Sequence, residues 1–140
     1  MINDGISVSA SPIFVNKDDP LFKNALNIKP IQGYEDIISH GDGKYFYAYG
    51  NDGTEYKYSP KEFVELIKNS QNYNGGAIRL LACDAGALVN GTAQQIANEL
   101  KVNVLAPTKA LWIYPDGDMF VASTRFERDG EWKVFRPEVL

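Results

Sequence analysis

The chain has one cysteine and one histidine among its 140 residues. A single cysteine excludes an internal disulfide and indicates nothing about the redox compartment. One cysteine and one histidine also argue against a structural zinc site, which takes about four ligands of these kinds. We therefore expect the protein to fold and act without a metal or another cofactor.

Long apolar runs and a strong positive charge are also missing. No apolar run approaches the ~20 residues that are needed to span a bilayer, and residues 1–5 have neither the basic nor the apolar region of a signal peptide. The net charge of −4 and the pI near 4.9 argue against nucleic acid, which is bound by basic surfaces. We expect no nucleic-acid or membrane partner, and any export address to lie in another part of a longer chain.

The composition is that of an ordinary globular protein, with 44% hydrophobic and 23% charged residues. Domains commonly contain ~100–150 residues, so residues 1–140 are predicted to form a single domain. Turn formers are frequent in residues 1–33, which we interpret as an irregular lead-in. Within it, a short strand is expected at 13–15 and a brief helical turn at 21–26.

After the lead-in, strand and helix patterns alternate. Strands are predicted at 36–39, 77–82 and 102–106, hairpins at 45–58 and 111–122, and a last hairpin turning at 129–130 into 132–135. Ser59, Pro60 and Glu62 have the spacing of a capping box with proline at the first helical position. Thr92 and Gln95 form a second capping pair before an amphipathic segment that ends near residue 100. This order predicts an α/β fold with a mostly parallel central sheet, helices on its faces and β-hairpins at its edge.

The single histidine and the single cysteine each follow a predicted strand. His40 ends the run at 36–39 and is followed by Gly41, while Cys83 ends the run at 77–82. The intervening hairpin and helix form a crossover long enough to make these two strands parallel neighbours. Ligands bind at the carboxyl ends of such strands. His40 and Cys83 are therefore predicted to meet at one edge of the sheet as a catalytic pair.

This pair has the chemistry of nucleophilic catalysis. A thiol needs a base to activate it, and histidine titrates near neutral pH and can also protonate a leaving group. Backbone N–H groups in the turns could bind a developing oxyanion, and Gly41 would let a substrate approach the backbone closely. The alternative is a non-catalytic binding domain, because a free cysteine in an apolar run is commonly a buried hydrophobic side chain. In that case the tyrosines of the 45–58 hairpin could form a partner surface.

Other active-site patterns fit less well. A Cys-x5-Arg phosphatase loop fails because Val89 stands where arginine is required, and Cys-x-x-Cys is absent. The run from Gly41 to Lys44 does not have the glycine spacing of a P-loop. The acidic residues in 116–118 and 127–129 lie in or beside predicted turns, where they are typical turn formers. A serine-based triad remains open, although the Gly-x-Ser-x-Gly pattern is not found.

The runs Ile37-Ile38-Ser39-His40-Gly41 and Ile78-Arg79-Leu80-Leu81-Ala82-Cys83 resemble the two signatures of the caspase-like (clan CD) cysteine peptidases. Residues 80–86, 93–98 and 104–108, with Trp112, also resemble a domain at the C-terminal ends of bacterial polymorphic toxins. The likeness covers roughly residues 25–137. It implies a caspase-like three-layer sandwich and an endopeptidase with Cys83 as nucleophile and His40 as general acid/base.

The resemblance has further implications. The N–H groups of Gly41 and Cys83 would form the oxyanion hole, and substrate would lie along residues 106–112. The candidate substrate-binding residues are Asp84, Thr108, Lys109 and Trp112. It also implies a peptide or protein substrate, a cognate immunity protein as partner, and a delivered or secreted effector carried on a longer toxin chain, with a cytoplasmic protein as the alternative. Two departures are the short chain and Asp84, whose carboxylate would tend to raise the pKa of the neighbouring thiol.

Overall fold

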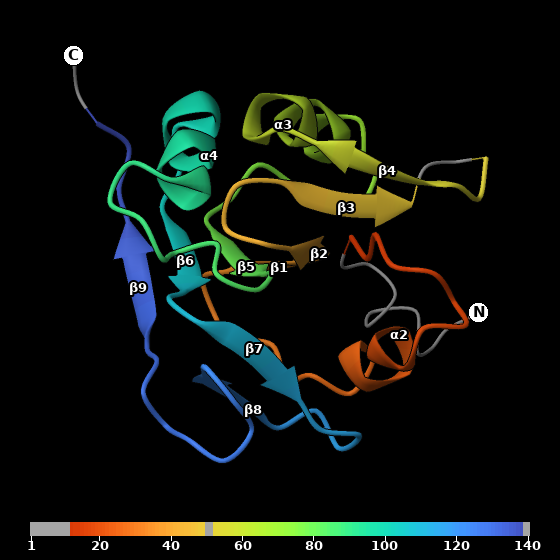
Figure 1. The fold of residues 1–140 in the computed structure, drawn as a ribbon. Coiled ribbons are helices and arrows are strands. Elements are labelled where there is room, and N and C mark those ends of the chain that lie inside the picture. The colour runs from red at the N-terminus through yellow and green to blue at the C-terminus, as the bar shows by residue number, and fades with distance from the viewer. Residues whose placement is uncertain (1–11, 50–51, 139–140) are drawn as a thin grey trace.

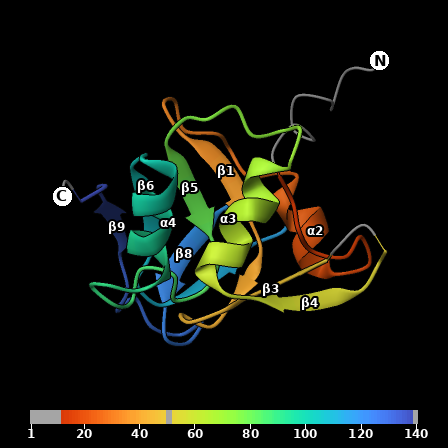
Figure 2. The same cartoon turned by 90° about the horizontal axis from the view of Figure 1, so that it is seen from above.

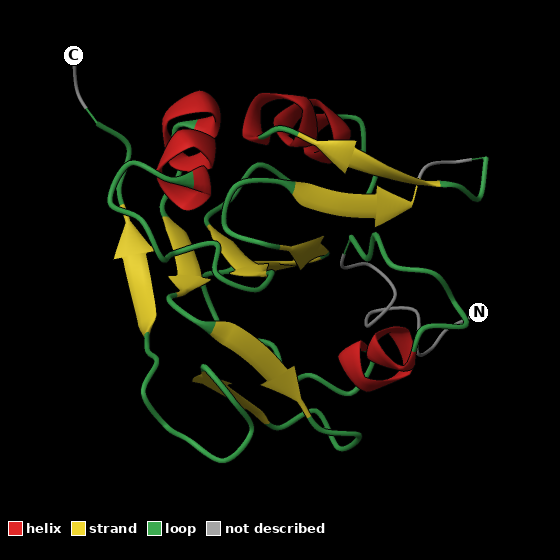
Figure 3. Ribbon diagram, in the orientation of Figure 1, coloured by secondary structure: helices red, strands yellow, loops and turns green. Residues whose placement is uncertain are grey.

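The computed structural model describes residues 12–49 and 52–138. The chain contains both helices and strands, as Figure 3 shows by colour. The elements are α2 (Pro20–Ala25), β1 (Glu35–Ile38), β2 (His40–Gly41), β3 (Phe46–Tyr49), β4 (Glu55–Tyr58), α3 (Pro60–Lys68), β5 (Ile78–Leu81), α4 (Thr92–Leu100), β6 (Val104–Pro107), β7 (Ala110–Ile113), β8 (Met119–Ala122) and β9 (Trp132–Phe135).

A four-stranded sheet forms the centre of the fold, with the order β1-β5-β6-β9. β1, β5 and β6 are parallel, and β9 is antiparallel to β6. The predicted mostly parallel sheet is thus confirmed, but the predicted last hairpin is wrong. Residues 123–131 are long enough to carry the chain to the free edge of β6, where Phe135 is buried in the core. Gly130 still donates a hydrogen bond to Val121 O, so only the turn stays beside β8.

The two faces of this sheet are covered differently. α3 and α4 lie together on one face, and α2 and the antiparallel β7–β8 hairpin lie on the other (Figures 1 and 2). Ile37, Leu80 and Val104 belong to the core beneath α3 and α4, and Ile38 and Leu81 to the core that faces α2 and β7. This division follows from the alternation of side chains along each strand. The fold is therefore a mixed α/β fold in which every residue of β5 is buried.

A second, antiparallel sheet contains β2, β3 and β4. The predicted β3–β4 hairpin is confirmed, with Phe46 opposite Tyr58; part of its turn, residues 50–51, lies outside the described residues. Phe46 stacks on Phe63 of α3, with ring centroids 4.0 Å apart. The hairpin therefore packs through aromatic side chains, which contribute large buried areas.

The two predicted helix starts have different outcomes. At α3 the capping box is complete, since Ser59 Oγ accepts from Glu62 N and Glu62 Oε1 accepts from Ser59 N. At α4 the capping-pair prediction is wrong, because Gly91 is the N-cap and has no side chain to cap with. Thr92 is buried, and its hydroxyl donates to Ala85 O instead. Burial against the loop after Cys83 thus overrides the local capping pattern.

Residues 12–33, the part of the lead-in that the structure describes, contain more regular structure than the sequence indicates. Ile13 forms a parallel bridge with Ile38, where a strand was expected, and α2 occupies the predicted helical turn. α2 has Asp19 as its N-cap and Pro20 in its first turn. Within 12–49 and 52–138, no helix is both long and apolar enough to cross a membrane.

Candidate active site

The strand register brings His40 and Cys83 together. Each residue of β1 pairs with the residue of β5 that lies 43 positions later, as Asp36 does with Arg79. His40 and Cys83 have the same separation, and Ser39 N donates to Leu81 O, so the alignment continues past the strand ends. Both residues line one pocket at the carboxyl ends of these parallel neighbours.

This pocket is small and mostly apolar, with a volume of about 170 Å³. The ends of β1 and β5, the first turn of α2 and one side of β7 enclose it. The lining residues are Leu21, Ser39, His40, Leu81, Ala82, Cys83, Leu111 and Ile113. The charge available there is therefore confined to His40 and its contacts.

His40 is held by a carboxylate from the lead-in. Its Nε2 lies 2.6 Å from Asp19 Oδ2, and the other oxygen of Asp19 accepts from Leu21 N as the N-cap of α2. Partial burial acts to raise the pKa of Asp19, but the hydrogen bonds from His40 and Leu21 N, with the charge of His40, outweigh it and lower that pKa. The ion pair is partly open to solvent, with 42% of the His40 side chain and 28% of the Asp19 side chain exposed.

Cys83 is held from the opposite side by β7. Its sulfur accepts a hydrogen bond from Leu111 N at 3.4 Å and donates a long one to Leu111 O at 3.9 Å. Burial raises the pKa of the Cys83 thiol, the Leu111 N–H lowers it, and the charge of Asp84 raises it further. The net effect is upward, so the thiol at rest is neutral at physiological pH and needs a base to become a nucleophile.

The turn after Cys83 has an unusual backbone. Asp84 adopts the left-handed conformation with φ 60°, and its N–H donates to Lys109 O at 3.0 Å. A Cβ built on Gly41 would lie 3.3 Å from Cys83 O, so Gly41 does bring the two turns into close contact. The N–H of Asp84 is therefore occupied by Lys109 O and is not available to a ligand.

The predicted substrate-binding residues lie outside this pocket. Trp112 points to the other side of β7, where its indole stacks on Phe120 and donates to Ala122 O. Thr108 Oγ1 accepts from Glu131 N, and neither Lys109 nor Asp84 lines the cavity. Trp112 lies outside the pocket because side chains alternate along a strand: Leu111 and Ile113 line the pocket, so Trp112 faces away from it.

Sequence reasoning missed Asp19 and Leu111. Asp19 lies among the turn formers of the lead-in, and an aspartate before proline is also a typical helix N-cap. Leu111 contributes backbone atoms, which no side-chain pattern reveals. The signal for Asp19 was therefore present, but its distance to His40 depends on how α2 docks.

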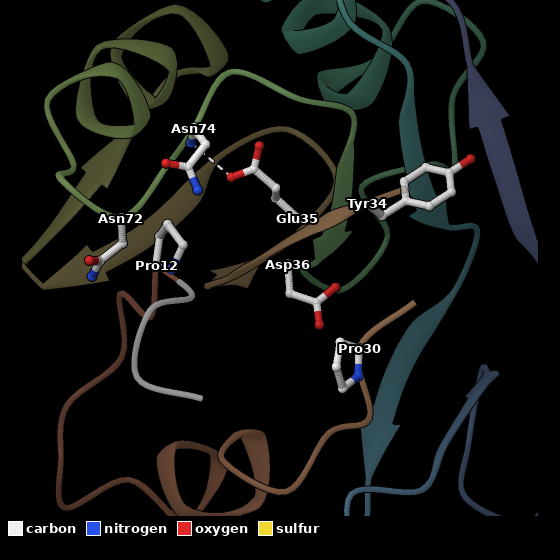
Figure 4. Close-up of a pocket in the computed structure, with 7 residues that line it drawn as sticks. All are labelled: Pro12, Pro30, Tyr34, Glu35, Asp36, Asn72 and Asn74. Atoms are coloured by element: carbon white, nitrogen blue, oxygen red, sulfur yellow. Dashed lines mark hydrogen bonds between the residues drawn. The ribbon is translucent and has the colours of Figure 1, made fainter. Parts of the chain in front are cut away.

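A second pocket of about 170 Å³ lies at the opposite, amino end of β1 (Figure 4). Glu35 lines it and accepts from the N–H groups of Asn74 and Gly76 at 2.8 and 2.7 Å. Asp36 also lines it and pairs with Arg79, whose side chain is buried. Both carboxylates thus have structural partners, and no chemistry follows from this pocket.

The remaining acidic clusters are turn formers, as predicted. Asp116 Oδ1 accepts from Asp118 N, and Asp129 accepts from the backbone N–H and hydroxyl of Ser123. In the part of the chain that the structure describes, no three histidine, cysteine or acidic side chains are grouped so that they could hold a metal ion. The pocket that contains His40 and Cys83 is therefore the candidate active site.

A family described as a domain of unknown function, DUF8616, matches residues 10–121, which contain His40, Cys83 and Asp19. No curated protein and no solved structure matches the chain. Because the match spans most of the sequence, the chain belongs to the DUF8616 family.

Proposed function

We propose that this domain is a cysteine peptidase with Cys83 as nucleophile and His40 as general acid/base. The observation that carries the proposal is that both side chains line one pocket at the carboxyl ends of two parallel strands. Ligand sites in such sheets lie at this edge. A nucleophile beside a base that is itself held by a third group is the usual arrangement for covalent catalysis.

The reaction begins when His40 removes the proton from Cys83 Sγ and the sulfur attacks the carbonyl carbon of the substrate. The oxygen of that carbonyl becomes an oxyanion, which the backbone N–H groups of the Gly41 and Cys83 turns bind. His40 then gives its proton to the leaving nitrogen, the C–N bond breaks, and a thioester remains. Water, deprotonated by His40, attacks the thioester, and the C–S bond breaks to release the acid and the thiol.

The raised pKa of Cys83 determines when the thiol becomes a nucleophile. Because burial holds the thiol neutral, His40 must take its proton when substrate is bound. The Leu111 N–H that now reaches the sulfur can stabilise the thiolate that forms. The resting enzyme is therefore predicted to react slowly with small alkylating agents and faster with peptide-like ones.

The lining of the pocket indicates the substrate. Leu21, Leu81, Leu111 and Ile113 surround the sulfur with hydrocarbon, and no free cation or anion lies among the lining residues. Burying an unpaired charge there would cost on the order of several kcal/mol. The pocket is thus suited to a small aliphatic side chain of a peptide, beside the bond to be cut.

The biological setting forms part of the same proposal. The His-Gly and Ala-Cys strand ends, with helices α3 and α4 on the adjacent face, support the caspase-like sandwich as the finer description of the fold. The motifs that resemble the C-terminal domains of bacterial polymorphic toxins support a toxin effector. Such an effector would be delivered on a longer chain and neutralised by a cognate immunity protein.

The test is covalent labelling by two peptidyl acyloxymethyl ketones, one with valine and one with aspartate next to the reactive group. Wild type should be labelled at Cys83, faster by the valine probe, and Cys83→Ala should not be labelled. His40→Gln should slow the labelling by at least about tenfold, because general acid/base catalysis contributes about 10²–10⁴. Ser70→Ala, a change far from the pocket, is the matched control. Equal rates in wild type and His40→Gln would refute the peptidase.

A non-catalytic interaction domain is the second candidate. The observation that favours it is that the Cys83 sulfur is largely buried and accepts a hydrogen bond from Leu111 N, while burial raises the pKa of its thiol. In that case Cys83 is a small core side chain. The same labelling experiment separates the two candidates, because an inert core cysteine reacts no faster with peptide probes than with iodoacetamide and does not depend on His40.

A further inference from the structure

We infer that Asp19 is a positioning residue for His40, which fixes the ring as the Nε2–H tautomer and leaves Nδ1 as the atom that takes the proton of Cys83. This inference rests on the proposed peptidase function and adds a third residue to it. The evidence is the 2.6 Å contact between Asp19 Oδ2 and His40 Nε2. A carboxylate only accepts hydrogen bonds, so the nitrogen that it contacts must carry the hydrogen.

The Asp19 carboxylate is held by α2 independently of its contact with His40. Its Oδ1 accepts from Leu21 N at 2.9 Å, which caps α2, and Pro20 restricts the first turn of that helix. Exposed ion pairs are usually weak because forming them costs the conformational entropy of two mobile side chains. The Asp19 side chain is already fixed as the N-cap of α2, so pairing with His40 costs it little further entropy.

α2 is in turn attached to the hairpin on the other side of the pocket. Asn24 Nδ2 donates to Ile113 O at 3.0 Å, and Asn27 Nδ2 donates to Pro115 O at 2.8 Å. Leu111 of the same hairpin contacts the Cys83 sulfur. The element that holds His40 and the element that holds Cys83 are thus tied to one another, which fixes the two reacting groups on a common support.

The proton balance follows from these contacts. In the proposed reaction Nε2–H donates to Asp19 Oδ2, so Nδ1 is the nitrogen that takes the thiol proton. When Nδ1 accepts the thiol proton, the ring becomes a cation beside an ionised carboxylate, and this charge pair stabilises the step. The proton then leaves from Nδ1 to the leaving nitrogen, while Asp19 stays ionised throughout. Without Asp19 the ring could rotate or change tautomer, and fewer encounters would be productive.

A purely structural role for Asp19 as a helix cap makes a different prediction. Serine is also a good N-cap, but its side chain is too short to reach His40. Asp19→Ser therefore keeps the cap and removes the contact. Asp18→Ser is the matched control, because Asp18 is the exposed neighbour and has no contact with the ring.

The experiment measures two quantities on the full chain. One is the rate of labelling by the valine probe, and the other is the NMR spectrum of ¹⁵N-labelled protein, in which the single histidine gives one set of imidazole signals. We expect a downfield, slowly exchanging Nε2–H proton in wild type and Asp18→Ser and its loss in Asp19→Ser. The labelling rate of Asp19→Ser should fall at least about tenfold with its thermal midpoint close to that of Asp18→Ser.

The outcomes separate this inference from the proposed function. A rate that falls in His40→Gln but not in Asp19→Ser overturns the role of Asp19 and leaves the peptidase standing. A wild-type spectrum without the Nε2–H signal, or with the hydrogen on Nδ1, overturns it as well. A rate that is unaffected by His40→Gln overturns both. A loss of rate in Asp19→Ser that is matched by an equal loss in Asp18→Ser assigns the effect to the helix and also overturns the inference.

Discussion

A buried ion pair joins the two strands that precede His40 and Cys83, and its removal gives the sharpest stability prediction. Asp36 on β1 and Arg79 on β5 are paired in the strand register, with Nε–Oδ1 at 2.6 Å and Nη2–Oδ2 at 2.7 Å. Only 4% of the Arg79 side chain and 10% of the Asp36 side chain are exposed. Arg79 also donates to Lys29 O, which attaches the loop after α2.

Asp36→Ala should leave the guanidinium buried with one hydrogen bond in place of three. Arginine cannot lose its proton in a protein, so the charge stays and the cost is about 3–5 kcal/mol. This is a large part of the ~5–15 kcal/mol that stabilises a typical domain. With a urea m-value of about 2 kcal/mol per molar, the unfolding midpoint should fall by about 2 M.

The control is the double variant Asp36→Leu with Arg79→Met, which removes both charges and keeps the volume. Its stability should lie within about 1 kcal/mol of wild type, because replacing a whole buried pair is often nearly neutral. Urea unfolding followed by tryptophan fluorescence measures all three proteins. A loss below about 1 kcal/mol in Asp36→Ala, or a double variant as unstable as the single one, would refute the reasoning.

Three further predictions concern single positions. Burial, followed by the charge of Asp84, raises the pKa of Cys83, so Asp84→Asn should lower that pKa and move the pH profile of iodoacetamide alkylation to lower pH; a profile that stays in place would contradict the assigned cause. Ser59→Ala should cost about 1 kcal/mol in urea unfolding by removing the α3 cap, and a loss near zero would show that the cap is dispensable. Gly117→Ala should cost at least about 1–3 kcal/mol, because the added Cβ would lie 1.9 Å from Asn27 O at a φ of 92°, and an unchanged midpoint would contradict that contact.

Local patterns in the sequence predicted the local elements well. Ser59 and Glu62 are adjacent on the first turn of a helix, so their spacing alone specifies the capping box. The apolar runs before His40 and Cys83 predict strands, and the crossover between them predicts a parallel pair. Because strand pairing proceeds residue by residue, the equal separation of Asp36 from Arg79 and of His40 from Cys83 carries the alignment as far as the site.

The remaining features arise from elements that meet only in the folded molecule. β9 takes the free edge of β6, Asp19 reaches His40, and Leu111 reaches the Cys83 sulfur. Each contact depends on the way in which an edge strand, a short helix or a hairpin docks, and docking is decided by packing of the whole core. The sequence by itself determined the strands that precede His40 and Cys83 and their parallel pairing. Only the tertiary structure decided which groups contact the His40 ring and the Cys83 sulfur, because a hydrogen bond between distant segments does not change the residue pattern of either segment.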